Sequence, residues 1–171
     1  AKLFELLGDA PITSVADVGA GKAHFTFALA RRLGAAGKVW AVEYDNEQVQ
    51  ILKQHLAKAQ VTNIAVVQSG ETQVNLPDAS CDLMVLRGVY HHFTQPGAMN
   101  QSLHRSLRPG GRLVLIDFPP SWFWSRVAPV PEVPKNRGGH GITPELAIQE
   151  LTQAGFSVQQ RIDRWSHSWY G

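Results

Sequence analysis

The sequence has a single cysteine, little net charge and no long apolar run, and each scarcity excludes a class of protein. One thiol, Cys81, cannot form an internal disulfide framework or a zinc site built on several thiolates. With 16 basic and 14 acidic residues the net charge is +2, so the chain lacks the strong field that gathers nucleic acid or anionic lipid. The longest apolar runs lie at 64–67, 83–86 and 113–116, far short of the ~18 residues of a membrane span.

The composition is that of one folded domain. Of the 171 residues, 44% are apolar and 18% are charged, which excludes a disordered chain. At ~150 residues per domain, this length predicts a single domain over residues 1–171. The amphipathic start, residues 1–7, lacks a signal-peptide core, and with the lone thiol this favours a cytoplasmic location. The chain begins with Ala instead of Met, so a removed signal stays an alternative.

Short apolar runs alternate with helical patterns along the chain. Strands are expected at 15–18, 39–42, 64–68, 82–86, 113–116 and 156–162, and helical patterns separate most of them, the first at 23–33. The runs are continuously apolar, which is typical of parallel strands covered on both faces by helices. The pattern predicts an α/β fold with a doubly wound, mostly parallel sheet, in which ligands bind at the carboxyl ends of the strands.

Two glycines and an acid stand at those strand ends. Gly19 and Gly21 follow the first expected strand and open a helix, where a backbone without Cβ can turn sharply and approach a ligand. Glu43 ends the second strand, 24 residues after Gly19 (43 − 19), where a carboxylate can accept hydrogen bonds from a ribose. The pattern predicts a nucleoside-containing cofactor. A dinucleotide would call for a third glycine where His24 stands, whereas S-adenosylmethionine carries no phosphate.

These motifs and their order resemble those of class I S-adenosylmethionine-dependent methyltransferases, in particular the branch of quinone-biosynthesis and small-molecule enzymes. The matching stretches are VADVGAG (15–21), VWAVEYD (39–45), Gly70-Glu71, CDLMVLRGVYHHF (81–93), LHRSLRPGGRLVLIDF (103–118) and GITPELAIQELTQAGF (141–156). The resemblance implies the Rossmann-like methyltransferase fold, the cofactor S-adenosyl-L-methionine and transfer of a methyl group to a small molecule.

The resemblance also implies a role for individual residues. Cofactor contacts are implied for the methionine portion at Asp17, Gly19, Ala20 and Gly21, for the ribose at Glu43, for the adenine at Tyr44, Gly70, Glu71 and Thr72, and for the reactive methyl at Leu86 and Arg87. Two alternatives stay open: Asp17 caps the glycine turn, and Glu71 begins a helix. The chain departs from the family at 22–24, where Lys-Ala-His replaces a glycine-containing stretch. It also ends at 171, where the family has a further antiparallel strand.

The acceptor side is expected after the fourth and fifth strands. His91 and His92 follow the fourth strand at the ligand edge and are candidate general bases, because imidazole accepts a proton near neutral pH. Tyr90 is a candidate substrate contact, and His140 is a second candidate base. Residues 118–141 are rich in proline and glycine, and we expect a lid over the acceptor there, with substrate contacts from Trp122, Phe123 and Trp124. The alternatives are a plain surface loop, and histidines that hydrogen-bond the backbone.

The expected function is therefore S-adenosylmethionine-dependent methyl transfer to a small, apolar or aromatic acceptor, with no metal site, no nucleic-acid partner and no membrane span. Neither the acceptor nor the oligomeric state can be read from the sequence. Two alternatives remain. A cofactor-binding module without catalysis is favoured by Lys22 and Ala23 and by the short C-terminus. A nicotinamide-dependent oxidoreductase is opposed by His24 and by the LRPGG turn at 107–111.

Overall fold

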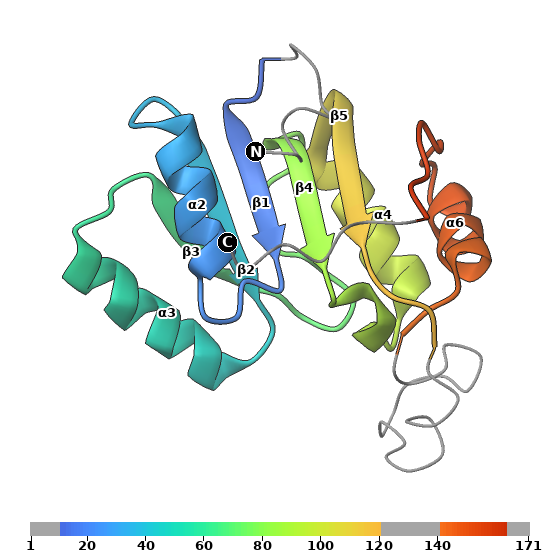
Figure 1. The fold of residues 1–171 in the computed structure, drawn as a ribbon, viewed down its shortest axis with the longest axis horizontal. Coiled ribbons are helices and arrows are strands. Elements are labelled where there is room, and N and C mark those ends of the chain that lie inside the picture. The colour runs from blue at the N-terminus through green and yellow to red at the C-terminus, as the bar shows by residue number, and fades with distance from the viewer. Residues whose placement is uncertain (1–10, 121–140, 164–171) are drawn as a thin grey trace.

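A computed structural model describes residues 11–120 and 141–163, and its centre is one parallel sheet (Figure 1). The strands are β1 (Ser14–Val18), β2 (Lys38–Glu43), β3 (Ile64–Gln68), β4 (Cys81–Arg87) and β5 (Leu107–Ile116), in the spatial order β3-β2-β1-β4-β5. The helices are α2 (His24–Leu33), α3 (Asn46–Ala59), α4 (Pro96–Ser106) and α6 (Pro144–Gln153), with a 3-10 helix, η1, at Tyr90–His92. All four strand pairings are parallel. This architecture confirms the predicted doubly wound α/β fold.

Helices cover both faces of the sheet. Val15 of β1 packs in one cluster with Leu29 of α2, whereas its neighbour Ala16 packs in another with Leu103 of α4. Figure 1 shows α2 and α3 on one face and α4 on the other, with α6 beside α4. Because successive side chains of a strand point to opposite faces, and both faces are covered here, the side chains on both faces must be apolar. This explains the continuous apolar runs.

The strand expected at 156–162 is not formed, so that prediction is wrong. Helix α6 ends in a turn in which Gly155 has φ +99°, and the Phe156 ring then packs edge-on against His104 of α4 at 5.1 Å. The chain is thereby directed toward α4 and not along the edge of β5. Val158 and Ile162 are 53% and 41% exposed, so these apolar residues are not buried as residues of a sheet strand would be. In the described residues the sheet therefore has no antiparallel strand.

The LRPGG turn lies inside β5 and not ahead of it. Cys81 of β4 pairs with Leu107, but the next recorded partner pair is Leu83 with Arg112, so residues 108–111 bulge out of the ladder. Gly110 supplies the left-handed backbone of the bulge with φ +78°. The strand thus starts at Leu107, earlier than the predicted 113, and helix α4 ends at Ser106.

One carboxylate ties this bulge to the first strand. Asp82 accepts hydrogen bonds from the backbone N–H groups of Thr13 and Ser14, both at 2.8 Å, and from the guanidinium of Arg108 at 2.6 Å. Burial alone raises the pKa of Asp82, but the bonds from Thr13, Arg108 and Ser14 outweigh it and hold the pKa below its ordinary value. The charged carboxylate therefore stabilises the fold.

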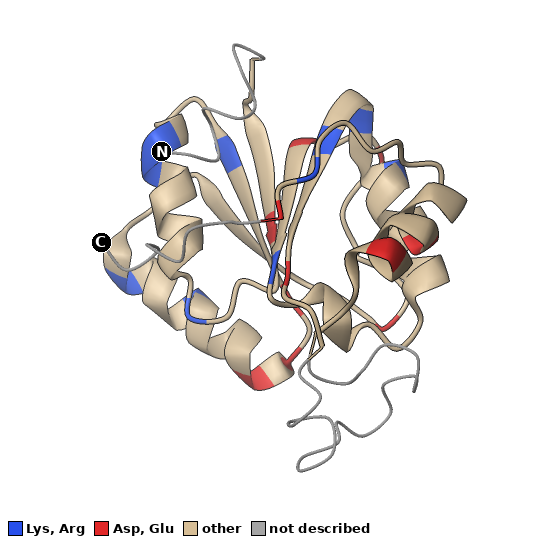
Figure 2. Ribbon diagram, turned by 45° about the vertical axis from the view of Figure 1, so that its right-hand side comes forward, with Lys and Arg blue, Asp and Glu red and all other residues tan. Residues whose placement is uncertain are grey.

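Figure 2 shows the positions of Lys and Arg and those of Asp and Glu distributed over several helices and strands of the described ribbon. None of the described helices is long and apolar enough to cross a membrane.

We expect Asp82→Asn to lower the free energy of unfolding by ~1–3 kcal/mol at neutral pH, the scale of hydrogen bonds to a charged group. Because the folded-state pKa of Asp82 is lowered, the difference is fully present above the unfolded value of ~3.9 and is lost as pH falls through the folded value. Urea denaturation from pH 2.5 to 7 measures it. The exposed Asp78→Asn variant is the control, and equal losses in both variants would contradict the assignment.

Candidate functional site

A tight turn joins β1 to α2 at the carboxyl edge of the sheet. The N–H groups of Gly19 and Ala20 both donate to the carbonyl oxygen of Val42, at 2.9 and 3.0 Å, so the turn is held over the end of β2. Gly19 has φ +81°, and a Cβ there would lie 2.9 Å from the side chain of Val89, the residue before η1. The turn is thus pressed between β2 and the segment that follows β4. This close packing explains the glycine at 19.

Glu43 lies directly against this turn. One carboxylate oxygen accepts the N–H of Gly21 at 2.8 Å, and the other accepts the N–H of Tyr44 at 2.8 Å. The N–H of Asp45 also donates to this second oxygen, at 3.4 Å. A carboxylate offers about four acceptor positions, so capacity remains for a hydroxyl group of a ligand. The structure therefore brings together Gly21 and Glu43, which the sequence placed at the ends of different strands.

Asp17 lies beneath the turn and is 3% exposed. Its carboxylate accepts the Thr26 hydroxyl at 2.6 Å, which ties the end of β1 to α2. Burial raises the pKa of Asp17 from 3.8 to about 6, against the lowering effects of the Thr26 hydrogen bond and the charge of Arg87. Thr26 was missed by the sequence analysis, because its spacing from Asp17 carries no motif. The side-chain hydrogen bond of Asp17 goes to α2 and not to the glycine turn, whose capping was the alternative role for this residue.

The residues assigned to the adenine lie together at the ends of β2 and β3. The Tyr44 hydroxyl points to a carboxylate oxygen of Glu71 at 3.5 Å, and the Tyr44 side chain is 58% exposed. Gly70 closes a small turn by donating to the carbonyl of Gln73 at 2.8 Å, and Thr72 is exposed beside it. Glu71 begins no helix in the structure, so its expected alternative role is wrong.

Leu86 and Arg87 end β4 in opposite environments. Leu86 is fully buried in the core cluster on the α4 side, so its side chain does not reach the sheet edge. Arg87 is exposed, and its guanidinium lies 5.0 Å from the ring centre of Phe25 in α2. Of these two predicted neighbours of the methyl group, only Arg87 presents its side chain at the edge.

Tyr90 is buried, and its hydroxyl group both donates and accepts a hydrogen bond. The hydroxyl donates to Glu150 of α6 at 2.9 Å and accepts from the amide of Asn100 in α4 at 2.7 Å. These bonds fasten η1 to two helices. The geometry favours a structural role for Tyr90 over the predicted substrate contact, and it adds Asn100 and Glu150, which no sequence motif had marked.

His91 forms a buried pair with Asp117, the residue that follows β5. Its Nδ1 lies 2.8 Å from one carboxylate oxygen, and its backbone N–H donates to the other at 3.1 Å. Both side chains are 4% exposed. The His91 ring also packs against His92, with ring centres 4.0 Å apart, and against Phe118, at 4.9 Å. Asp117 was missed, although an acid directly after a strand at the ligand edge was a usable signal.

The predicted lid begins and ends beside this pair. Ile142 donates to the carbonyl of Phe118 at 2.9 Å, so the two ends of the segment meet next to His91. Trp122, Phe123, Trp124 and His140 lie outside the described residues, as does most of the predicted lid at 118–141.

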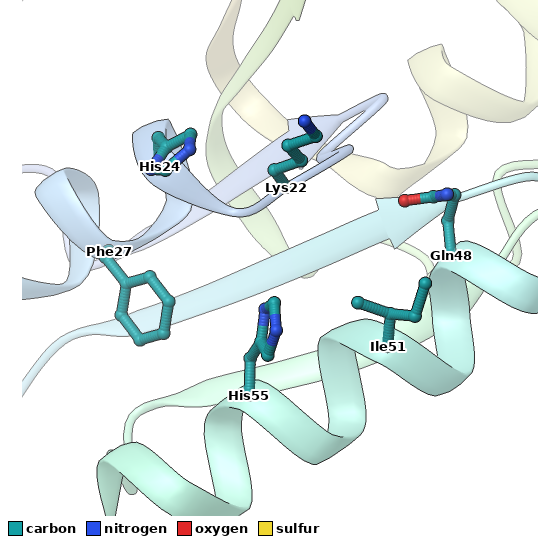
Figure 3. Close-up of a pocket in the computed structure, with 6 residues that line it drawn as sticks. All are labelled: Lys22, His24, Phe27, Gln48, Ile51 and His55. Carbon is teal, nitrogen blue, oxygen red and sulfur yellow. The ribbon is translucent and has the colours of Figure 1, made fainter.

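A hollow of about 410 Å³ opens between α2 and α3 (Figure 3). It is lined by Lys22, His24, Phe27, Gln48, Ile51 and His55. Ala23, between the first two of these, is 1% exposed and holds a left-handed φ of 64°. The turn is therefore built around this alanine. In the described residues, no group of three His, Cys, Asp or Glu side chains is arranged to hold a metal ion.

Comparison with known proteins places this geometry in a family context. A family model described as a methyltransferase domain matches residues 16–115. A demethylmenaquinone methyltransferase from a Geobacillus species is 26% identical over 105 residues, which cover 59% of this chain and 43% of the relative. A ubiquinone/menaquinone biosynthesis C-methyltransferase from a Shewanella species is 25% identical over 116 residues, covering 67% and 46%. The chain thus spans less than half the length of these curated relatives.

A solved structure shares the fold over nearly the whole chain. The crystal structure of a SAM-dependent methyltransferase from Aquifex aeolicus superposes with a TM-score of 0.74 and 25% identity, covering 93% of this chain and 80% of that one. The similarity confirms the Rossmann-like methyltransferase fold that the sequence motifs implied.

We expect Gly19→Ala to lower the free energy of unfolding by ~2–4 kcal/mol, the sum of a left-handed alanine and an overpacked contact with Val89. Gly97→Ala is the matched control, since a Cβ at Gly97 in α4 meets nothing within 4 Å. Gly97→Ala should leave the free energy of unfolding unchanged or raise it by up to ~1 kcal/mol. Thermal and urea denaturation measure both, and a Gly19→Ala protein as stable as Gly97→Ala would show that the turn is not closely packed.

The raised pKa of Asp17 makes the charged carboxylate a destabilising group. Stability should fall as pH rises from the unfolded pKa of ~3.9 through about 6, by ~3 kcal/mol for a shift of about two units. Asp17→Asn keeps an acceptor for the Thr26 hydroxyl and should remove this dependence of stability on pH. The stability of the variant relative to the wild type should therefore rise between pH 4 and 8. Urea midpoints across this range, with Asp78→Asn as control, measure the gain. Parallel curves for wild type and Asp17→Asn would refute the assignment.

Proposed function

The chain belongs to the methyltransferase domain family, whose members use S-adenosylmethionine, and from this membership we propose that it transfers a methyl group to a small, apolar or aromatic acceptor. The observation that carries the proposal is the position of Glu43 against Gly21, at the carboxyl ends of β2 and β1. In doubly wound sheets ligands bind at this edge.

The chemistry of the edge fits the cofactor. Asp17 pairs with Ala41 of β2, two residues before Glu43, so the two carboxylates belong to the same corner of the sheet, and two carboxylates suit a ligand that carries a sulfonium and an ammonium group. Glu43 would hold the ribose hydroxyls, and the backbone at Gly19, Ala20 and Gly21 would lie along the methionine portion. The adenine would lie near Tyr44, with Gly70, Glu71 and Thr72 beside it. When bound, S-adenosylmethionine supplies an electrophilic methyl carbon.

The contribution of the chain is mainly to bind, orient and exclude water. Methyl transfer is an in-line displacement, so catalysis depends on holding the acceptor atom on the line through the methyl group. Arg87, exposed at the end of β4, lies next to this line of approach in our assignment. The predicted lid, with Trp122, Phe123, Trp124 and His140, would complete the enclosure.

The acceptor class is supported from two sides. The names of two relatives refer to quinones, which are flat and largely apolar. In this chain Phe118, which is 48% exposed beside the buried ring of His91, offers a flat acceptor an aromatic surface. A binding module without catalysis is the second candidate, favoured by Lys22, Ala23 and His24 in place of the family's glycine-containing stretch. The buried Ala23 in its left-handed position weakens that argument, because the turn forms without the glycine.

Calorimetric titration with S-adenosylhomocysteine tests the cofactor assignment. The wild type should bind it and should not bind NADH. Glu43→Ala should weaken binding about 10–100-fold, since two sugar hydroxyls lose a charged acceptor worth ~1.5–3 kcal/mol. Glu47→Ala, an exposed acid in the first turn of α3, is the control and should bind as the wild type does. Unchanged affinity in Glu43→Ala would refute the ribose assignment, and a methylation screen separates the enzyme from a binding module.

A further inference from the structure

The hollow between α2 and α3 has apolar walls that come from both helices. Figure 3 shows Phe27 pointing from α2 toward α3, and Ile51 and His55 pointing from α3 toward α2. Phe27 and Ile51 are each half-buried, so part of their apolar surface is open to a molecule in the hollow. The volume of about 410 Å³ lies within the range of ~300–1,000 Å³ that is usual for small-molecule pockets.

The titratable side chains of the lining are all of basic type. Lys22 lies in the turn before α2, His24 is the first residue of that helix, and His55 belongs to α3. No carboxylate lines the hollow, and α2 has no acid in its first turn. Glu43, which accepts the N–H of Gly21, is not among the lining residues. The positive charge of Lys22 therefore lies beside apolar walls.

The fold makes no use of the polar groups in this lining. No hydrogen bond or ion pair joins their side chains to another described residue; the four are Lys22, His24, Gln48 and His55. Ala23 is 1% exposed and packs in a core cluster to which α3 contributes, whereas its two neighbours are exposed. The turn is thus anchored by the alanine, and the lysine and the histidine on either side of it remain available to a ligand.

Two of these side chains belong to the stretch in which the sequence departs from the methyltransferase pattern. Residues 22–24 read Lys-Ala-His in place of a glycine-containing stretch. The structure gives each of the three residues a place, since the middle one is buried and the outer two line the hollow. The cofactor assignment leaves both outer residues without a role.

We propose that the hollow binds a flat, apolar organic acid, with its ring system against Phe27, Ile51 and His55 and its carboxylate toward Lys22 and Gln48. Figure 3 shows Lys22 and Gln48 at the same end of the hollow. The lysine ammonium and the glutamine amide both supply N–H donors for a carboxylate. The hollow lies outside the cofactor edge, so this site does not depend on the proposed function.

Other classes of ligand match the lining less well. An organic cation would be repelled by Lys22. A small inorganic anion would leave the apolar walls uncovered and would gain only an exposed ion pair, which is worth little. A neutral apolar molecule would take water from Lys22 and Gln48 without replacing its hydrogen bonds. A flat acid uses both parts of the lining, because aromatic rings pack well against the rings of Phe27 and His55.

Backbone amide chemical shifts of the full chain, recorded during addition of naphthoate at constant pH, test the site. Saturable changes should centre on Phe27, Ile51 and His55, with a Kd of about 0.1–1 mM, the scale expected for so small a ligand. Naphthalenemethanol and naphthylmethylamine, substituted at the same ring position, replace the carboxylate by a neutral and a cationic group. The alcohol should bind about 2–5-fold more weakly than the acid, and the amine more weakly still.

A first pair of variants tests the charge. Lys22→Met should weaken the binding of naphthoate about 2–5-fold and leave the binding of naphthalenemethanol unchanged, since only the acid uses the ammonium group. Lys53→Met removes an exposed lysine of α3 that does not line the hollow, and it should bind both probes as the wild type does. Both lysines are exposed, so both variants should fold.

A second pair of variants tests the location. Ile51→Trp should abolish the binding of naphthoate and of naphthalenemethanol, because the larger side chain fills the hollow. Gln50→Trp places the same side chain at an exposed position of α3 outside the lining, and it should bind both probes normally. Equal binding in the two tryptophan variants would overturn the location.

The remaining outcomes separate this site from the cofactor edge. Changes centred on Gly19, Gly21 and Tyr44, or displacement of naphthoate by S-adenosylhomocysteine, would overturn the assignment to the hollow. Equal affinities for the acid, the alcohol and the amine would overturn the ligand class. The absence of saturable changes up to ~10 mM naphthoate, well above the expected Kd, would overturn the site itself. Failure to bind S-adenosylhomocysteine would count against the proposed function alone.

Discussion

The carbonyl oxygen of Val42 accepts two N–H groups from the turn after β1, and the arrangement of the site depends on this contact. It draws Gly19 and Ala20 over the end of β2, which brings Gly21 within hydrogen-bond distance of Glu43. The turn can pack this closely only because position 19 has no Cβ, since the side chain of Val89 occupies the space that a Cβ would need. This backbone acceptor thereby joins the ends of β2 and β1, and the packing of Gly19 against Val89 adds the segment that follows β4.

The segments after β4 and β5, where we propose that the acceptor binds, are held by a second, independent set of contacts. Two residues hold η1 in place. Tyr90 forms hydrogen bonds with Asn100 and Glu150, and His91 forms a hydrogen bond with Asp117. The buried polar groups in this region are nearly all paired, but the amide oxygen of Asn100 has no recorded partner. Rigid support of this kind suits a group that must meet a substrate at a defined angle. The rigid part of this region therefore includes Asn100 and Glu150, which hold Tyr90, as well as the pair of His91 and Asp117.

The sheet and the places of Gly19, Gly21 and Glu43 at its strand ends could be predicted from the sequence, because they depend on local signals. Continuous apolar runs predict buried parallel strands, and Gly19, Gly21 and Glu43 sit at fixed distances from the strand ends. Residues 156–162, in which only three of seven residues are apolar, form no strand, and the ring of Phe156 packs instead on His104 of α4. The order of apolar and polar residues within a segment does not show which neighbouring element the segment will pack against.

The arrangement of the residues that follow β4 could be predicted only in part. His91 was marked by its residue type and place, but its partner Asp117 lies 26 residues away, and strand pairing alone brings them together. Tyr90 was marked for the same reasons as His91, yet the 3-10 turn sends its ring into the core. The direction of a side chain in such a short turn depends on tertiary packing, which residue type does not encode.

The central claim is that the cofactor lies at the carboxyl edge of β1, β2 and β4. Backbone amide chemical shifts of the full chain, recorded during addition of S-adenosylhomocysteine, test it most directly. The account predicts the largest changes at Gly19, Gly21 and Tyr44, with little change at Phe27, Ile51 and His55 in the hollow between α2 and α3. Changes centred on that hollow, or no change at a saturating concentration, would contradict it.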